Sequence, residues 1–444
     1  MSTQDAAEQA TAGQVAKLAL PALGVLAAEP LYLLVDTAVV GHLGAVALGG
    51  LAVGAVVLAQ VSTQLTFLSY GTTARSARLH GAGRRADAVT EGAQATWLAL
   101  AVGLLIVLAV QVFAGPITDL LAGGGEVAIQ AQRWLRIAVL GAPLVLVTLA
   151  GNGWMRGVQD TVRPLRYVLV GNGVSAVLCP VLVHGTDLGL AGSAVANVCA
   201  QVLAAALFLS ALRTEAQRSA DVRLSPQPRL MWAQLLLGRD LVLRSLGFQL
   251  CFLSAAAVAA RFGAASVAAH QVVLQLWNFV ALVLDSLAIA AQALVGAALG
   301  AARTAGAHRL AWRITRWSTV LGIGLSLLFA ALYAVLPRVF TSDEAVLAEI
   351  PKAWWFFVVL MPVAGVVFAL DGVLLGAGDA RFLRTATLAS AVLGFLPVIW
   401  LSLAFGWGLV GIWSGLSLFM LVRLAAVVGR TRSGRWAVAG ASLG

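Results

Sequence analysis

The chain has 444 residues, of which 60% are hydrophobic and only 11% are charged, and its mean hydropathy is +0.92. Apolar runs of about 18 residues or more recur along the whole length, which is the pattern of helices that cross a bilayer. This balance excludes a soluble globular protein. The net charge of +10 would fit a nucleic-acid-binding protein only if the basic residues formed a patch, and they do not.

The beginning of the chain, Met1 to Ala16, is polar and shows no small-residue cleavage site, which predicts a retained first helix and not a removed signal peptide. From there the hydropathy predicts an all-α integral membrane fold with twelve transmembrane helices. The expected segments are 17–42, 46–74, 92–114, 127–151, 165–185, 189–212, 240–262, 266–298, 311–336, 351–377, 385–404 and 407–428.

The arginines lie mainly beside the even-numbered connections and in the tail, for example at Arg84, Arg85, Arg381 and Arg384. The odd connections hold few basic residues, and acidic residues dilute them. The positive-inside rule therefore places both termini and the even loops in the cytoplasm. The basicity reflects membrane topology, so no nucleic acid is expected as a partner; membrane lipids are.

An internal repeat is the most informative feature of the sequence. A shift of 219 residues superposes Gly44 on Gly263, Pro143 on Pro362, Asp160 on Asp379 and Gly189 on Gly408. Six helices per repeat keep both halves in the same orientation, so the repeats are parallel, and a central cavity between them is expected. The predicted parts are an N-lobe at 1–213, a cytoplasmic linker at 214–238, a C-lobe at 239–430 and a cytoplasmic tail at 431–444.

Two repeats that could open alternately to either side are typical of a transporter. No phosphate-binding glycine loop exists, and the only lysines are Lys17 and Lys352, so transport is predicted to be driven by an ion gradient and not by ATP. Cys179, Cys199 and Cys251 lie in apolar segments and indicate packing. We expect no cofactor, no metal site and no enzymatic activity.

Four carboxylates lie inside predicted spans, where charge is costly: Glu29, Asp36, Asp285 and Asp371. In the sister repeat Asp36 aligns with Ala255, Asp285 with Thr66 and Asp371 with Asn152, so the scaffold does not require these acids. Glu29 and Asp36 are seven residues apart, about 10 Å along one helix face, which makes both candidates for proton coupling. Pro30 is a candidate hinge. The alternative is a permanently hydrogen-bonded acid beside a fixed kink.

Further polar side chains in the spans are candidates for a substrate cavity. Those between 271 and 292 follow helical spacing along one stripe, which could equally form a hydrogen-bond seam between helices. Asp371 precedes Gly372, which could ease a break in the helix. Asp160 and Asp379, at helix ends, are expected to be caps. The cavity candidates are Gln60, Gln64, Asn152, Asn172, Gln271, Gln275, Asn278, Asp285 and Asp371, and the stripe also includes Gln292.

The stretches "VDTAVVGHLG" from Val35, "GNGWMRGVQDTVRPL" from Gly151, "AAHQVVLQLWNFVALVLDSLAIAAQALVG" from Ala268 and "LDGVLLGAGD" from Leu370 resemble the multidrug and toxic compound extrusion (MATE) family. The last two resemble its DinF-like branch. The resemblance spans roughly residues 15–430. It implies two six-helix lobes that export cationic or amphipathic compounds against protons or sodium, with Asp36 as the proton-linked residue and bending of its helix as part of the cycle.

One departure from the family pattern bears on the coupling ion. Relatives often carry an Asn and, four residues later, an Asp in the fifth helix, as partners of the first-helix Asp. Here Ser175 and Cys179 take those places, and Asn172 one turn earlier is a candidate substitute. Because a bound hard cation needs several oxygen ligands, the departure disfavours sodium more than protons.

The sequence therefore predicts a monomeric, proton-coupled, multi-pass exporter of small molecules in a bacterial inner membrane, with sodium coupling less favoured. One alternative is a flippase for a lipid-linked precursor in the same superfamily, which needs several inward basic residues, and only Arg156 and Arg244 are expected near the membrane interior. An integral-membrane transferase is a weaker alternative, because it would need paired acids for a metal-bound diphosphate.

Overall fold

The computed structural model describes residues 11–219 and 221–441, and every regular element in these ranges is helical. The elements of the first half are α2 (Ala12–Gly41), α3 (Ala45–Leu65), α4 (Phe67–Gly81), α5 (Arg85–Ala122), α6 (Gly125–Ala138), η1 (Val139–Gly141), α7 (Ala142–Gly157), α8 (Val162–His184) and α9 (Leu190–Gln217). Those of the second half are α10 (Pro228–Arg261), α11 (Ala264–Gly300), α12 (Thr304–Ala331), α13 (Leu336–Phe340), α14 (Glu344–Glu349), α15 (Pro351–Gly376), α16 (Ala380–Ser390), η2 (Ala391–Phe395), α17 (Leu396–Phe405) and α18 (Gly408–Arg432).

Over the described ranges, 12 helical spans are long and apolar enough to cross a membrane. Three of them contain a local change of helix type or a break: α3 continues into α4, α6 into α7 through η1, and α16 into α17 through the π-helical turn η2. The chain is a multi-pass membrane protein, and the prediction of an all-α fold with twelve spanning helices is confirmed.

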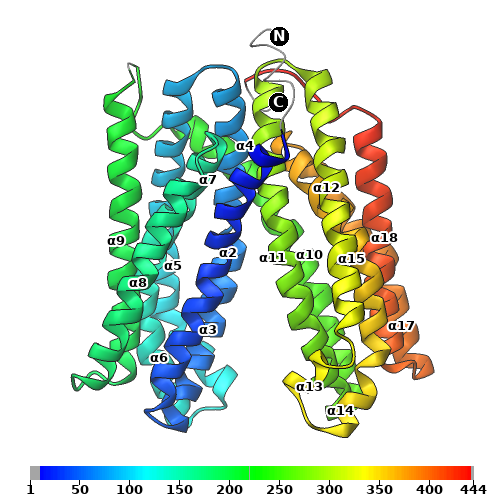
Figure 1. Ribbon diagram of the computed structural model, residues 1–444. Coiled ribbons are helices and arrows are strands. Elements are labelled where there is room, and N and C mark those ends of the chain that lie inside the picture. The colour runs from blue at the N-terminus through cyan, green and yellow to red at the C-terminus, as the bar shows by residue number, and fades with distance from the viewer. Residues whose placement is uncertain (1–10, 220, 442–444) are drawn as a thin grey trace. The chain divides into compact units, whose positions relative to one another are not determined.

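The helices pack into two compact units (Figure 1). One unit is Leu20–Gly238, called the N-lobe below. The other begins at Arg239 and also includes the first turns of α2 up to Ala19; it is called the C-lobe. The long helix α10 therefore contributes its first part to the N-lobe and its larger part to the C-lobe.

The internal repeat is visible in the helix packing of each lobe. In the N-lobe, a Cβ on Gly153 of α7 would lie 2.4 Å from the carbonyl oxygen of Ser69 on α4. In the C-lobe, a Cβ on Gly372 of α15 would lie 2.2 Å from the carbonyl oxygen of Ala288 on α11. Gly153 and Gly372, and likewise Ser69 and Ala288, are 219 residues apart. Glycine is required at both sites because two helix backbones come into direct contact there.

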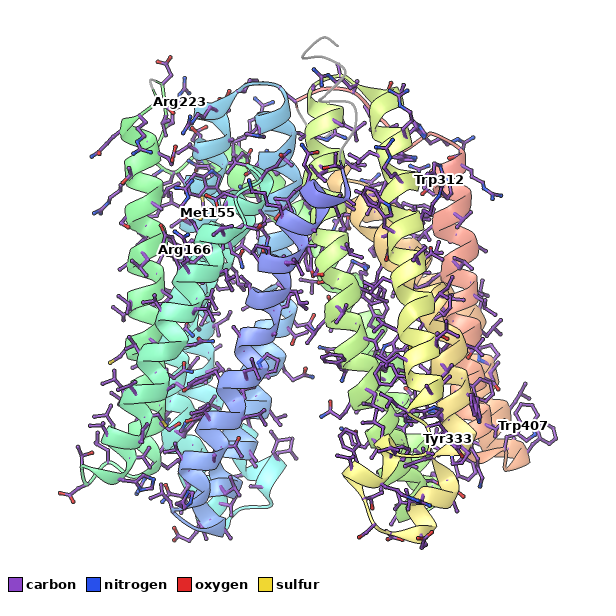
Figure 2. The ribbon with its side chains drawn as sticks, in the orientation of Figure 1. Met155, Arg166, Arg223, Trp312, Tyr333 and Trp407 are labelled. Carbon is purple, nitrogen blue, oxygen red and sulfur yellow. The ribbon has the colours of Figure 1, made fainter. Side chains whose placement is uncertain are left out.

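The outer faces of the lobes are apolar, as a lipid-facing surface requires. On α5, Leu104, Leu105 and Leu108 are more than half exposed. In the C-lobe, Tyr333 and Trp407 lie near one end and Trp312 near the other (Figure 2). Tyr333 packs against Trp355 at 5.2 Å between ring centroids. Aromatic rings at the two ends of spanning helices are typical of membrane–water interfaces.

Candidate functional site

Asp36 of α2 is the centre of a polar cluster inside the N-lobe. Its side chain is buried, with 2% of the residue exposed. Ser193 of α9 donates a hydrogen bond to Asp36 Oδ1 at 2.7 Å, and the Cys179 thiol of α8 lies 3.1 Å from the same oxygen. Three helices thus converge on one carboxylate, and both of these partners are neutral donors.

The cluster extends along α2 and α8 as a series of hydrogen bonds. One turn before Asp36, the Tyr32 hydroxyl accepts a hydrogen bond from Ser175 at 2.9 Å. One turn earlier again, the Asn172 amide donates to the Ala28 carbonyl at 3.0 Å. Spacings of three and four residues on both helices keep these groups in register. The two helices are therefore joined by polar contacts along their length, with the carboxylate at one end.

This geometry defines the roles of the residues that depart from the family pattern. Cys179 contacts Asp36 directly, whereas Ser175 bonds Tyr32 and Asn172 bonds a backbone carbonyl. Ser193 is a partner that the sequence analysis missed. Its position in the sister repeat is Ile412, so the repeat comparison that singled out Asp36 could also have found Ser193.

Glu29 and Asp36 do not lie in the same environment. Glu29 and Pro30 are exposed, while Asp36 is buried. Helix α2 runs without interruption through both Pro21 and Pro30. Because Pro30 has no backbone N–H, the carbonyl four residues earlier, at Leu26, lacks its usual helical donor. The helix is locally weakened on the N-terminal side of Asp36.

The remaining N-lobe candidates are spread over α3 and α7. Gln60 is exposed and Gln64 is half-buried on α3. The side-chain amide of Gln64 has no hydrogen-bond partner within the described ranges, and neither does Asn152 Oδ1 on α7. Asn152 is buried. The structure does not bring these three residues into the Asp36 cluster.

The polar stripe of α11 passes through different environments. Gln271, Gln275 and Asn278 are exposed, and Asn278 donates to Gln275 at 3.4 Å. Asp285 is half-buried, and Gln292, in the C-terminal half of α11, is buried. The stripe is thus open along its first turns and enclosed at its far end.

Asp371 of α15 forms a second charged cluster, within the C-lobe. Arg244 of α10 and Arg423 of α18 both donate to Asp371 Oδ2, at 2.7 and 2.5 Å. The expected break at Gly372 does not occur, because α15 continues to Gly376 and Gly372 serves the close contact with α11. Two further arginines are buried within the protein, since Arg423 and Arg78 are 2% and 1% exposed.

The two repeated aspartates at helix ends have local partners. Asp160 accepts a hydrogen bond from the Arg163 backbone N–H at 3.1 Å at the start of α8, which is a capping contact. Asp379, at the start of α16, instead accepts from Arg430 of α18 at 2.7 Å. Neither aspartate is hydrogen-bonded to the Asp36 cluster or to the Asp371 cluster within the described residues.

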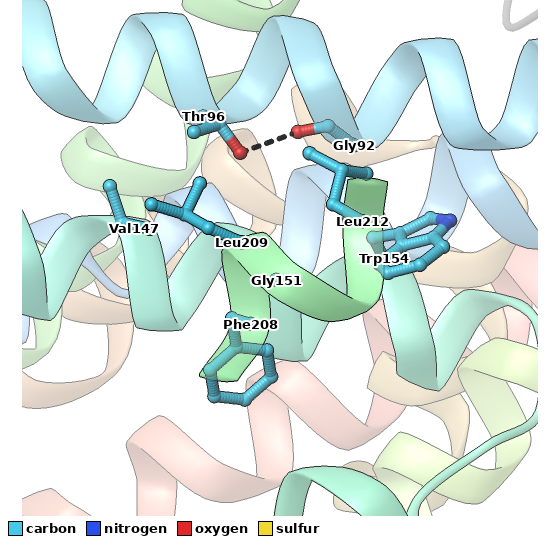
Figure 3. Close-up of a pocket in the computed structure, with 8 residues that line it drawn as sticks. All are labelled: Gly92, Thr96, Val147, Gly151, Trp154, Phe208, Leu209 and Leu212. Carbon is cyan, nitrogen blue, oxygen red and sulfur yellow. Dashed lines mark hydrogen bonds between the residues drawn. The ribbon is translucent and has the colours of Figure 1, made fainter. Parts of the chain in front are cut away.

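A crevice between α5, α7 and α9 is separate from both charged clusters (Figure 3). It is lined by apolar side chains such as Trp154 and Phe208, and its one hydrogen bond between lining residues joins Thr96 to the Gly92 carbonyl at 2.9 Å. It contains no charged lining residue. Across the described parts of the chain, no three His, Cys, Asp or Glu side chains gather as metal ligands would.

Known membrane transporters are similar to this chain in sequence over most of its length. The MatE family model matches residues 21–181 and 241–400, which is one segment in each repeat. DNA damage-inducible protein F of Escherichia coli (strain K12) is 34% identical over 94% of this chain and 92% of its own length. Protein DETOXIFICATION 44, chloroplastic, of Arabidopsis thaliana is 32% identical over 95% of this chain and 83% of its own length.

Solved structures share the fold. The crystal structure of MATE in the bent conformation matches with a TM-score of 0.88 at 18% identity, covering 98% of this chain and 97% of that one. A MOP superfamily transporter from Pyrococcus furiosus matches with a TM-score of 0.84 at 19% identity, covering 96% and 95%. The twelve spans and the paired repeats are those of the MATE fold. The chain belongs to the MatE family of multidrug-type transporters.

Proposed function

We propose that this protein exports cationic or amphipathic small molecules against protons, with Asp36 as the carboxylate that couples the two fluxes. The observation that carries the proposal is the burial of Asp36 among neutral donors, Ser193 and Cys179. Among the described residues, no cationic side chain forms an ion pair with Asp36. Protonation of the Asp36 carboxylate therefore changes the net charge of the cluster and weakens its hydrogen bonds.

The same contacts favour a proton over a sodium ion as the coupling ion. Na⁺ is a hard cation that needs several oxygen ligands, and one of the two groups on Asp36 is a thiol, which is a soft ligand. Tyr32 and Ser175 are already bonded to each other at 2.9 Å. A proton needs only the carboxylate oxygen and one acceptor site. Sodium remains the less favoured coupling ion.

Pro30 is proposed as the hinge that turns protonation of Asp36 into a change of α2. The missing N–H of Pro30 lies almost two turns before Asp36, and the Tyr32–Ser175 and Asn172–Ala28 contacts lie in and around that interval. Loss of charge at Asp36 would release one end of this series. MATE has been solved in a bent and in a straight conformation, so the fold itself permits more than one state.

The remaining parts of the proposal concern orientation and substrate contacts. We place the protein in a bacterial inner membrane with both termini in the cytoplasm, on the strength of the arginine distribution. We also propose the functional division expected from the sequence, with repeats at 1–213 and 239–430, a linker at 214–238 and a tail at 431–444, working as a monomer that exposes a cavity alternately to the two sides. Glu29 is a secondary coupling candidate, and the proposed substrate contacts are Gln60, Gln64, Asn152, Asn172, Gln271, Gln275, Asn278, Asp285 and Asp371.

Reconstituted vesicles test the coupling. Uptake of a cationic dye is measured under an imposed pH gradient, under an imposed Na⁺ gradient and with neither. The pH gradient alone should drive uptake, and Asp36→Asn should reduce it to the level of empty vesicles. Asp343→Asn is the matched control, because Asp343 caps α14 through Ala345 N–H at 2.8 Å and asparagine caps equally well. Wild-type uptake by Asp36→Asn, or uptake driven only by Na⁺, would refute the proposal.

A further inference from the structure

The cluster of Arg244, Asp371 and Arg423 has more positive than negative charge. Two guanidinium groups meet one carboxylate, so one positive charge is left in excess. All three residues lie within helices long and apolar enough to span the membrane, and Arg423 and Asp371 are 2% and 5% exposed. An uncompensated charge inside a membrane protein is expensive, and residues that create one are most often functional.

The hydrogen bonding of the cluster is incomplete. Both arginines donate to the same oxygen, Asp371 Oδ2, and Asp371 Oδ1 makes no hydrogen bond within the described chain. The Nε–H groups of Arg244 and Arg423 are buried and also have no acceptor there. A carboxylate that accepts from one guanidinium through both oxygens is the usual saturated arrangement. Here donors of two guanidinium groups remain available to another acceptor.

The excess charge is not neutralised by the next acid along α10. Asp240, one turn before Arg244, already accepts from Arg384 at 2.6 Å and from Arg239 at 3.2 Å. The faces of the two guanidinium groups are occupied by an aromatic ring, since Phe248 lies 5.5 Å from Arg244 and 4.6 Å from Arg423. The rings hold the arginines in place and add an apolar wall, and they provide no negative charge.

The sister repeat shows that the scaffold does not need this cluster. The positions that correspond to Arg244, Asp371 and Arg423 in the N-lobe are Val25, Asn152 and Ala204. The close glycine contact next to Asp371 is retained in both lobes, so the helices pack in the same way without the charges.

We propose that Arg244 and Arg423 form a binding site in the C-lobe for the oxyanion of an acidic, partly apolar ligand, a carboxylate or a phosphate-type group. Asp371 bridges the two arginines in the unliganded state, and the ligand supplies the second acceptor that the cluster lacks. The apolar body of the ligand would lie against Phe248 and its neighbour Phe419, whose ring centroids are 5.6 Å apart. The site goes beyond the proton-coupled export proposed above and does not depend on the coupling ion.

Binding of three probes to the purified full-length protein tests this site. The probes are 2-naphthoate, neutral 2-naphthamide and cationic 2-naphthylmethylammonium, measured by equilibrium dialysis in an uncharged detergent without any ion gradient. The naphthoate should bind at least tenfold more tightly than the amide. Arg244→Gln and Arg423→Gln should each remove that preference, whereas Asp371→Asn should tighten naphthoate binding about fivefold or more, because the competing carboxylate is gone.

Arg430→Gln is the matched control. Arg430 lies seven residues after Arg423 on α18, pairs with Asp379 and packs over Phe382 at 5.2 Å, so it repeats the arrangement with a single acid for a single arginine. Its loss should leave naphthoate binding unchanged. If one arginine variant does not fold, the opposite changes expected for the other arginine variant and for Asp371→Asn still decide the matter.

The source of the anion is separated by the lipid. Naphthoate binding is measured in nanodiscs of anionic phosphatidylglycerol and in nanodiscs of phosphatidylcholine. If phosphatidylglycerol weakens binding to the wild type but not to Arg244→Gln, the anion is a lipid headgroup. If the lipid has no effect, the ligand is soluble. Either result supports the site. Equal binding of the naphthoate and the amide to the wild type, or weaker naphthoate binding by Asp371→Asn, would overturn it even if proton-driven export by Asp36 is intact.

Discussion

Ser193 of α9 donates a hydrogen bond to Asp36 of α2 at 2.7 Å, and in the sister repeat the same two positions hold Ile412 and Ala255, both fully buried. The positions of this polar pair in one lobe hold two buried apolar residues in the other. Conversely, the charged pair Arg244 and Asp371 of the C-lobe corresponds to the uncharged residues Val25 and Asn152 of the N-lobe. The two lobes share their backbone packing, and each adds one charged centre of its own.

Removal of the Ser193 hydroxyl should impair transport without unfolding the protein. A hydrogen bond to a charged group contributes about 1.5–3 kcal/mol, so Ser193→Ala should slow pH-driven dye uptake by about tenfold or more. Ser210→Ala is the control, because Ser210 lies on the same helix and its hydroxyl donates to the Leu207 carbonyl of its own helix. Equal uptake by both variants would show that Ser193 has no part in coupling.

The hinge proposal predicts a difference between the two prolines of α2. Pro30→Ala restores a helical hydrogen bond beside the polar contacts with α8 and should reduce transport severalfold while Asp36 is unchanged. Pro21→Ala restores the same bond more than two turns earlier and should transport at a nearly normal rate. Initial rates of dye uptake under a pH gradient compare the two. Similar rates for both variants would remove Pro30 from the mechanism.

The close helix contacts should tolerate no added methyl group. A Cβ on Gly372 would lie 2.2 Å from a backbone oxygen, so Gly372→Ala should lower the free energy of unfolding by about 2 kcal/mol or more. Gly324→Ala, on α12, meets no atom within 4 Å and should be neutral or stabilising by up to about 1 kcal/mol through helix propensity. Thermal unfolding in detergent compares the variants, and equal melting temperatures would contradict the packing.

Two residues other than glycine, Gln159 and Ala302, adopt left-handed backbone conformations at positions where the sister repeat has glycine. Ala302 has φ 59° and corresponds to Gly83, with φ 73°. Ala302→Gly should therefore stabilise the protein by up to about 1 kcal/mol, and Gly83→Ala should destabilise it by about 1–2 kcal/mol, because no side chain near Gly83 would clash. Opposite shifts of the melting temperature are expected, and shifts in the same direction would contradict this account.

The connection between the lobes is fastened to α5 by Gln94. Its amide donates to the Ser225 carbonyl at 2.9 Å and accepts from the Gln227 N–H at 2.6 Å. Gln94→Ala should release this segment and accelerate trypsin cleavage after Arg223 and Arg229 by about tenfold. Gln111→Ala, also on α5, removes a hydrogen bond to the Arg136 carbonyl and should leave these cleavage rates unchanged. Unaltered cleavage in Gln94→Ala would mean that other contacts hold the segment.

The sequence by itself determined the membrane fold. A bilayer leaves no alternative to helices for apolar runs of this length, so the twelve spans follow from hydropathy alone. The repeat offset singled out Asp36 and Asp371 as acids that the scaffold does not require. Both inferences rest on features that are local in the chain or periodic along it.

Only the tertiary structure decided which side chains meet. Ser193 is more than 150 residues from Asp36 along the chain, and Arg423 is 52 residues from Asp371. Neither contact can be predicted from hydropathy or from residue spacing. The direction of each side chain around α2 made Asp36 buried and Glu29 exposed, although the two residues are seven positions apart on the same helix. Helix rotation and packing, which depend on all neighbouring helices together, made Asp36 a partner of neutral donors and Asp371 a partner of two arginines.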